Sequence, residues 1–134
     1  MEILNETIIK QLVANGTQQD KVRGTEQEID FFPVVKLFTP DANCTWLLTE
    51  IDPEHPDIAF GLCDLGMGFP ELGNVSIAEL RALRGVLGLP VERDLYFEPA
   101  HPLSVFTRAA QTASAITTSA AALEKAASEM EAGQ

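Results

Sequence analysis

The sequence predicts a small α+β domain: a mainly antiparallel sheet of four or five short strands packed with one or two helices, plus a C-terminal Ala-rich helix. Three observations lead to this prediction. Short apolar runs rich in β-branched and aromatic residues are separated by clusters of turn-forming residues, which is typical of strands joined by turns. Helical periodicity is confined to the two ends of the chain and one capped segment. With 134 residues, of which 46% are hydrophobic, the chain is long enough for one domain with its own core.

The N-terminal segment is expected to be a helix followed by a linker. Apolar residues recur at helical spacing over residues 4–15, which predicts a short amphipathic helix. Asn5 or Thr7 is suited to cap its start, and Gly16 is suited to end it. The polar, aperiodic stretch that follows predicts a linker, so residues 1–30 precede the core.

The core domain is expected over residues 31–99. Its predicted strands are residues 34–38, 44–51, 58–65 and 91–97. The second and third strands are separated by a loop with two prolines, which exclude a helix there, and they are expected to form a hairpin. A register that opposes Ile51 and Ile58 would place Trp46 opposite Cys63.

Two cysteines, Cys44 and Cys63, are too few for a disulfide scaffold or a structural zinc site. On the expected register they are diagonal neighbours at about 7–8 Å. A disulfide across that distance would require backbone movement. We therefore expect free thiols that pack as small apolar side chains.

A capping box predicts a helix after the third strand. Ser76 precedes Glu79 by three residues, so each side chain can bond a free N–H group of the first helical turn. Ile77 and Leu80 continue at helical spacing, and Gly85 marks the expected end.

Residues 100–134 are expected to lie outside the core as an Ala-rich helix or tail. Over residues 103–131, apolar residues recur three and four positions apart, as in a coiled coil. Thr117, Thr118 and Ser119 lower the helix propensity in the middle of this segment. Two roles remain open: a single, loosely attached helix, or an interface through which copies of the chain form a homo-oligomer.

Composition narrows the function classes. The net charge of −11 and the pI of about 4.4 would repel a phosphate backbone, so direct nucleic-acid binding is not expected. A protein partner with a basic surface is favoured instead. The apolar runs are far shorter than the ~20 residues that span a bilayer, so no membrane association is expected. The N-terminus lacks the basic and apolar regions of a signal peptide, which predicts a cytoplasmic location.

The core sequence resembles a known family. The segments that carry the resemblance are PVVKLFTPDANCTWLLTEIDP, DIAFGLCDLGMGFPELGNVSIAELRALRG and LGLPVERDLYFEP. They are similar to small bacterial proteins of unknown function that are often encoded on plasmids, phages and integrative elements. The resemblance covers about residues 31–99, and the N-terminal helix is also similar. It implies a compact α+β domain and a mobile-element setting, and it supplies no catalytic residue or cofactor.

Acidic residues are concentrated in one stretch of the sequence. No lysine or arginine occurs between Lys36 and Arg81, whereas eight acids do. A solvated acidic face that serves solubility is the simplest interpretation. The functional interpretation is a binding surface for a basic partner, and the candidate binding residues are Asp41, Glu50, Asp52, Glu54, Asp57, Asp64 and Glu71.

We expect a non-enzymatic accessory or regulatory protein of a mobile genetic element that acts by protein–protein contact through this acidic surface. Mobile elements benefit from proteins that occupy host nucleic-acid-binding surfaces. Closely spaced carboxylates can imitate phosphates electrostatically, so imitation of nucleic acid is a narrower form of the same hypothesis.

The alternative hypothesis is a small metal-dependent enzyme that uses the carboxylates of loop 52–57 and Glu71. Carboxylates and an imidazole bind hard or borderline cations. The candidate metal ligands are Asp52, Glu54, His55 and Asp57. Their spacing matches neither an EF-hand nor a zinc motif. Carboxylates with raised pKa values in a cleft would favour the enzyme, and a flat acidic surface would favour the binding protein.

Overall fold

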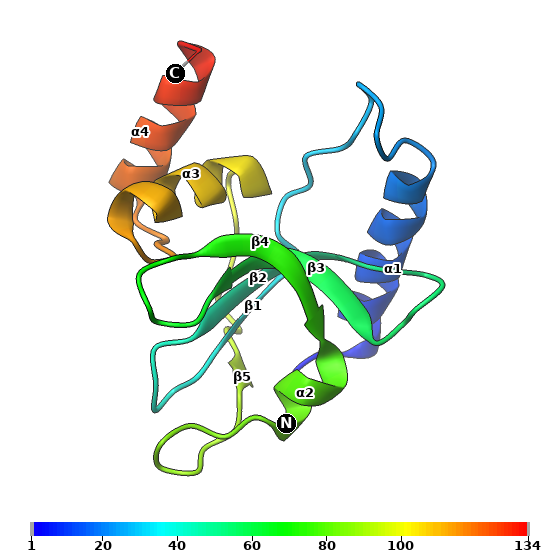
Figure 1. Ribbon diagram of the computed structural model, residues 1–134, viewed down its shortest axis with the longest axis vertical. Helices are drawn as coiled ribbons and strands as arrows, with labels where there is room; N and C mark the ends of the chain where they lie inside the picture. The colour runs from blue at the N-terminus through cyan, green and yellow to red at the C-terminus, as the bar shows by residue number, and fades with distance from the viewer. Residues whose placement is uncertain (1, 134) are drawn as a thin grey trace.

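The computed structural model describes residues 2–133 and confirms the predicted α+β class. In chain order its elements are α1 (Glu6–Asp20), β1 (Val35–Phe38), β2 (Thr45–Ile51), β3 (Ile58–Asp64), β4 (Glu71–Ser76), α2 (Ile77–Ala82), β5 (Glu92–Arg93), α3 (Leu103–Ala113) and α4 (Ala120–Glu131). The strands form one antiparallel sheet in the order β4-β3-β2-β1-β5 (Figure 1). Within residues 2–133, no helix has the length and hydropathy needed to cross a membrane.

Helices cover both faces of the sheet, and successive side chains of β2 are buried alternately on one face and the other. Trp46 and Leu48 join the core cluster that includes Leu12 of α1. Leu47, between them in sequence, joins the second cluster, which includes Phe106 of α3. Figure 1 accordingly shows α1 on one side of the sheet and the α3–α4 pair on the other. The result is a three-layer arrangement with two separate apolar cores.

The prediction that Gly16 ends the first helix is wrong. Helix α1 starts at the predicted cap, where the Asn5 side chain accepts a hydrogen bond from the Ile8 N–H at 2.8 Å. It then runs through Gly16 to Asp20. A Cβ atom at Gly16 would lie 1.9 Å from the carbonyl oxygen of Ile51 in β2. Glycine is therefore needed here because the helix backbone touches the sheet backbone.

The hairpin register is confirmed at one end and wrong by one residue at the other. Trp46 pairs with Cys63, as predicted. Ile51, however, pairs with Ala59 instead of Ile58. A β-bulge in β2 accounts for the difference, since it adds one residue to that strand alone.

The bulge lies between Leu48 and Glu50 and reverses the alternation of side chains. Without it, Glu50 would follow Trp46 and Leu48 onto the face beneath α1. Ile51 takes that place in the first core cluster instead. Glu50 lies with Phe60 on the other face, where both line the same pockets.

One strand was not expected from the sequence, and another is shorter than expected. The segment 71–76 forms β4 along the edge of β3, although its Gly73 and Asn74 have low strand propensity. Backbone hydrogen bonds to β3 stabilise the extended conformation of this segment. The strand expected over residues 91–97 is reduced to the two residues of β5.

Helix α2 begins at the predicted cap and ends earlier than predicted. The Ser76 hydroxyl accepts a hydrogen bond from the Glu79 N–H at 3.2 Å, which confirms one half of the capping box. The helix ends at Ala82, three residues before Gly85.

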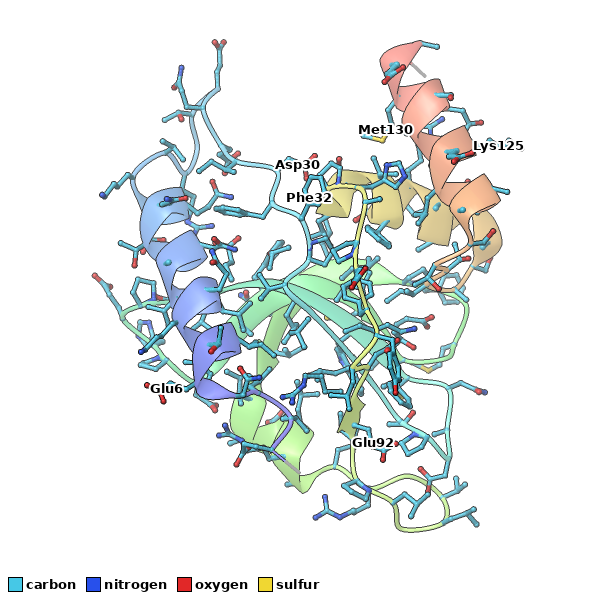
Figure 2. The ribbon with its side chains drawn as sticks, turned by 180° about the vertical axis from the view of Figure 1, so that it is seen from behind. Glu6, Asp30, Phe32, Glu92, Lys125 and Met130 are labelled. Carbon is cyan, nitrogen blue, oxygen red and sulfur yellow. The ribbon has the colours of Figure 1, made fainter. Side chains whose placement is uncertain are left out.

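The Ala-rich segment forms two helices instead of one. Ser114 adopts a left-handed conformation (φ 60°) that ends α3, and the Ser119 side chain caps the start of α4. Helix α3 packs on the sheet and is not a loosely attached tail. Helix α4 packs on α3, and the Arg108 guanidinium lies 3.3 Å from the Glu129 carboxylate. Figure 2 shows Met130 on the side of α4 towards α3.

The linker after α1 is tied to both neighbouring layers. The Gln19 side chain both donates to and accepts from the backbone of Ile29. The Asp30 carboxylate accepts hydrogen bonds from the N–H and hydroxyl groups of Ser104, in the first turn of α3 (Figure 2). The polar linker thus joins the two layers of helices across the edge of the sheet.

Candidate functional site

Three of the seven acids predicted to bind a partner are used inside the fold. The Asp41 carboxylate accepts hydrogen bonds from the N–H groups of Leu87 and Leu89, at 2.7 and 3.2 Å. Asp64 is buried and accepts from the N–H groups of Gly66 and Ile116, both at 2.9 Å. Each carboxylate connects loops that are distant in sequence.

Asp57 is the third acid with an internal role. Its carboxylate accepts hydrogen bonds from the Ser76 hydroxyl and, at 2.8 Å, from the Ala78 N–H at the start of α2. These two bonds lower the pKa of Asp57, because they favour the ionised form. Asp57 therefore anchors the β2–β3 loop to α2.

The candidate metal ligands do not converge. Asp57 is directed to α2, while Asp52 accepts from the Glu54 N–H at 2.9 Å and lies 3.1 Å from His55 Nδ1. The Glu54 N–H bond is the main cause of a lowered pKa for Asp52, and the His55 bond adds to it. Among residues 2–133, no three His, Cys, Asp or Glu side chains are grouped so that they could hold a metal ion. Glu71 is exposed at the far end of β4.

Glu50 lies with two of the other predicted acids in one pocket, which we call the Glu50 pocket. This pocket of about 290 Å³ is lined by Asp20, Arg23, Glu50, Asp52, Glu54, Ile58, Phe60 and Asn74. It lies where the end of α1 and the loop after it approach the β2–β3 hairpin. Sequence reasoning identified Glu50, Asp52 and Glu54, but it missed Asp20 and Arg23 because they come from the segment expected to be a linker.

Glu50 is the most unusual group in this pocket. It is only 5% exposed, and its Oε2 atom is buried without a hydrogen bond. The nearest charge is the Arg23 guanidinium, whose Nη2 lies 3.6 Å from Oε2 and 2.8 Å from Asp20 Oδ1. Burial raises the pKa of Glu50, and the positive charge of Arg23 opposes that increase.

Most of the exposed apolar side chains lie at the opposite end of the sheet, and the others lie along its β5 edge. Among residues 2–133, every large apolar side chain that is more than half exposed belongs to one of three loops. Their exposed fractions range from 54% for Leu65 to 91% for Tyr96. We call this set the loop-end surface, and it consists of Leu65, Met67, Phe69, Val86, Leu87, Leu95 and Tyr96.

The β1–β2 turn contacts two of these three loops. A Cβ atom at Gly66 would lie 2.8 Å from the Cβ atom of Asn43, so the β3–β4 turn touches the β1–β2 turn. Asp41 of the same turn bonds the loop that carries Val86 and Leu87. In Figure 1 these loops lie to the left and lower left, away from α1.

A cleft of about 840 Å³ lies beside the loop-end surface. It is lined by the β1–β2 and β3–β4 turns, by residues 92–96 and by residues 114–116 between α3 and α4. The Lys36 ammonium and the Asp94 carboxylate form an ion pair at 3.5 Å, and both residues line the cleft. The lining of the cleft therefore combines an ion pair with the apolar side chains of Leu95 and Tyr96.

The Cys63 thiol does not have the properties of a catalytic nucleophile. Both cysteines are free in the structure. Burial raises the pKa of the Cys63 thiol to about 11, so almost none of it is ionised at neutral pH. Cys44 is half-buried beside the loop-end cleft.

The loop-end surface was not predicted from the sequence, although a signal for it exists. Met67 and Phe69 alternate with Gly66 and Gly68, and such closely spaced glycines are typical of a turn. Closely spaced glycines disfavour a regular strand or helix that could bury the apolar residues between them. Such a pattern indicates side chains that a tight turn presents to solvent.

Comparison with known proteins identifies one match. A family model described as "Protein of unknown function (DUF2958)" matches residues 3–117. The match extends beyond the segment 31–99 on which the sequence resemblance was based, and it includes α1 and α3. Helix α4 lies outside it. No match was found among curated proteins or among solved structures.

Proposed function

The chain belongs to the DUF2958 family of proteins of unknown function, and we propose that it is a non-enzymatic accessory protein that acts by contact with a protein partner. The observation that carries this proposal is the loop-end surface. Seven large apolar side chains project from three loops beside an open cleft, five of them at one end of the sheet and Leu95 and Tyr96 along its β5 edge. Contiguous exposed apolar side chains on a soluble domain are typical of protein interaction sites.

Charge favours a basic partner, as the sequence predicts. The protein carries a net charge of −11, which would steer a positively charged surface towards it. Of the predicted binding acids, Glu54, Asp57 and Glu71 are exposed and Asp52 is partly so, although the Asp57 carboxylate already bonds Ser76 and Ala78. We place this encounter in the cytoplasm of a cell that carries the mobile element encoding the protein.

Imitation of nucleic acid is a narrower version of the proposal. It would require a row of carboxylates that face solvent, and the internal bonds of Asp41, Asp57 and Asp64 remove three acids from such a row. The test is a competition: the protein should displace nucleic acid from its partner. A partner that binds nucleic acid and this protein together would limit the proposal to protein contact alone.

Site-specific photo-crosslinking in a bacterial host would test the proposal. A photoreactive phenylalanine analogue would replace Phe69 or Tyr96 in the loop-end surface. The matched control is Phe32, which is 50% exposed but lies in the linker before β1. We expect one discrete adduct from positions 69 and 96, no adduct from position 32, and weaker capture of the adduct's partner at high salt. The same adducts from all three positions would contradict a specific contact at the loop ends.

An acid–base enzyme is the second candidate, because burial raises the pKa of Glu50 in a pocket. A carboxyl group whose pKa is raised by burial is a candidate for proton transfer. Glu71 lies at the far end of β4 and does not line this pocket. A substrate screen in which Glu50→Gln abolishes any turnover would favour this candidate over the binding protein.

A further inference from the structure

The Glu50 pocket contains a buried acceptor that the protein does not satisfy. Glu50 Oε2 has no hydrogen bond, although the side chain is more than nine-tenths buried. An ionised carboxylate oxygen in this position is costly unless a donor reaches it. Arg23 cannot fully supply that donor, because its Nη2 is 3.6 Å from Oε2 and already bonds Asp20 at 2.8 Å.

The other groups around this oxygen define the chemistry of the missing donor. Four carboxylates line the pocket, those of Asp20, Glu50, Asp52 and Glu54, against one guanidinium. This excess of negative charge selects a cation. A metal ion is not indicated, since no three suitable ligands among residues 2–133 are grouped together.

The apolar part of the pocket indicates an organic cation with a long stem. Ile58 and Phe60 line the pocket together with the carboxylates. The aliphatic stem of a basic side chain can pack on such residues while its charged end reaches the carboxylates. A guanidinium fits better than an ammonium, because its planar array of five donors can bond more than one carboxylate at once. Arg23 already places one guanidinium between Asp20 and Glu50 in this pocket.

We propose that the Glu50 pocket receives an arginine side chain of the partner protein, whose guanidinium donates to Glu50 Oε2. This inference rests on the proposed function, because it assumes a protein partner. It adds a second contact, distant from the loop-end surface, and it states what the partner must carry there.

The test is an NMR titration of the full chain with N-acetyl-arginine amide. The uncharged isostere N-acetyl-citrulline amide and N-acetyl-lysine amide serve as comparisons. We expect the arginine probe to cause saturable shifts of the Asn74 side-chain amide and of the Ile58 and Phe60 backbone amides, with weaker effects from lysine and none from citrulline. No saturable shift, or equal shifts from arginine and citrulline, would overturn the proposal.

Variants separate a specific site from general charge attraction. Glu50→Gln should weaken binding of the arginine probe at least tenfold, whereas Glu124→Gln, which removes the same charge from an exposed position on α4 outside the pocket, should leave it nearly unchanged. Equal weakening by both variants would overturn the proposal. If Glu50→Gln fails to fold, Glu54→Gln at the exposed rim should still weaken binding several-fold. The titration uses no partner, so its outcome is independent of the crosslinking result.

Discussion

Replacement of Asp64 should show whether this acid is structural, as the fold indicates, or a binding residue, as the sequence suggested. Its two carboxylate oxygens each accept one backbone N–H, from Gly66 and from Ile116. Asp64→Ala removes both acceptors and leaves two donors unsatisfied. Asp64→Asn keeps one acceptor oxygen and should therefore lose about half as much.

The magnitude follows from the two bonds. Hydrogen bonds to a charged group contribute about 1.5–3 kcal/mol each, so Asp64→Ala should cost roughly 3–6 kcal/mol and Asp64→Asn about 1.5–3 kcal/mol. A domain of this size is usually stable by about 5–15 kcal/mol, so both losses should be measurable without complete unfolding of the asparagine variant.

Urea denaturation followed by tryptophan fluorescence is a suitable assay. Trp46 is the single tryptophan and is only 2% exposed, so it reports directly on unfolding of the sheet. Glu71→Gln is the control, since it removes a carboxylate from an exposed position. The reasoning would be refuted if Asp64→Ala changed the free energy of unfolding by less than about 1 kcal/mol, below the contribution of even one such bond.

Three further predictions follow from the fold. Gly16→Ala should destabilise the protein by roughly 2–5 kcal/mol, because the alanine Cβ would lie 1.9 Å from the Ile51 carbonyl oxygen. A melting temperature within about one degree of the wild type would disprove this close contact. The raised pKa of Glu50 means that the native state binds the carboxyl proton more tightly than the unfolded chain does. The protonated Glu50 therefore stabilises the protein at low pH, and this stabilisation is lost as the pH rises from about 4.5 through the raised pKa. Glu50→Gln should remove this pH dependence from denaturation curves recorded across that range, although Asp20 and Arg23 remain nearby. Deletion of residues 118–134 should leave a folded sheet with lower stability, because α4 packs on α3 and contributes only Leu123 and Ala126 as buried side chains. Loss of the strand signal in circular dichroism would show that the sheet cannot fold without α4.

Local patterns in the sequence were sufficient for the elements that local chemistry determines. Asn5 and Ser76 were recognised as helix caps because a short polar side chain bonds the nearby N–H groups in almost any context. The Trp46–Cys63 pair, in contrast, was not fixed by the six-residue loop, and it is correct because the bulge in β2 offsets the one-residue error at Ile51.

Features that depend on tertiary contact were not predictable. Gly16 looks like a helix end in the sequence, and only the approach of β2 explains why glycine continues the helix. The bulge before Glu50 has no sequence signature, yet it decides that this carboxylate enters a pocket and not the core beneath α1. The sequence shows that acidic residues are concentrated in one stretch, but it does not show which of their carboxylates are bonded inside the fold. Hydrogen bonds from distant loops determine which acids remain available to a partner.

The Asp41 carboxylate has a consequence for the thermodynamics of recognition. It holds the N–H groups of Leu87 and Leu89, so the loop that presents Val86 and Leu87 is preorganised before any partner arrives. A loop that is already ordered loses less conformational entropy on binding. Each mobile, rotamer-rich side chain that binding immobilises costs about 0.5–1.5 kcal/mol of binding free energy. A half-buried acid on one turn thereby makes the apolar side chains of another loop more effective as a contact surface. Affinity at the loop ends should accordingly depend on a residue that the partner never touches.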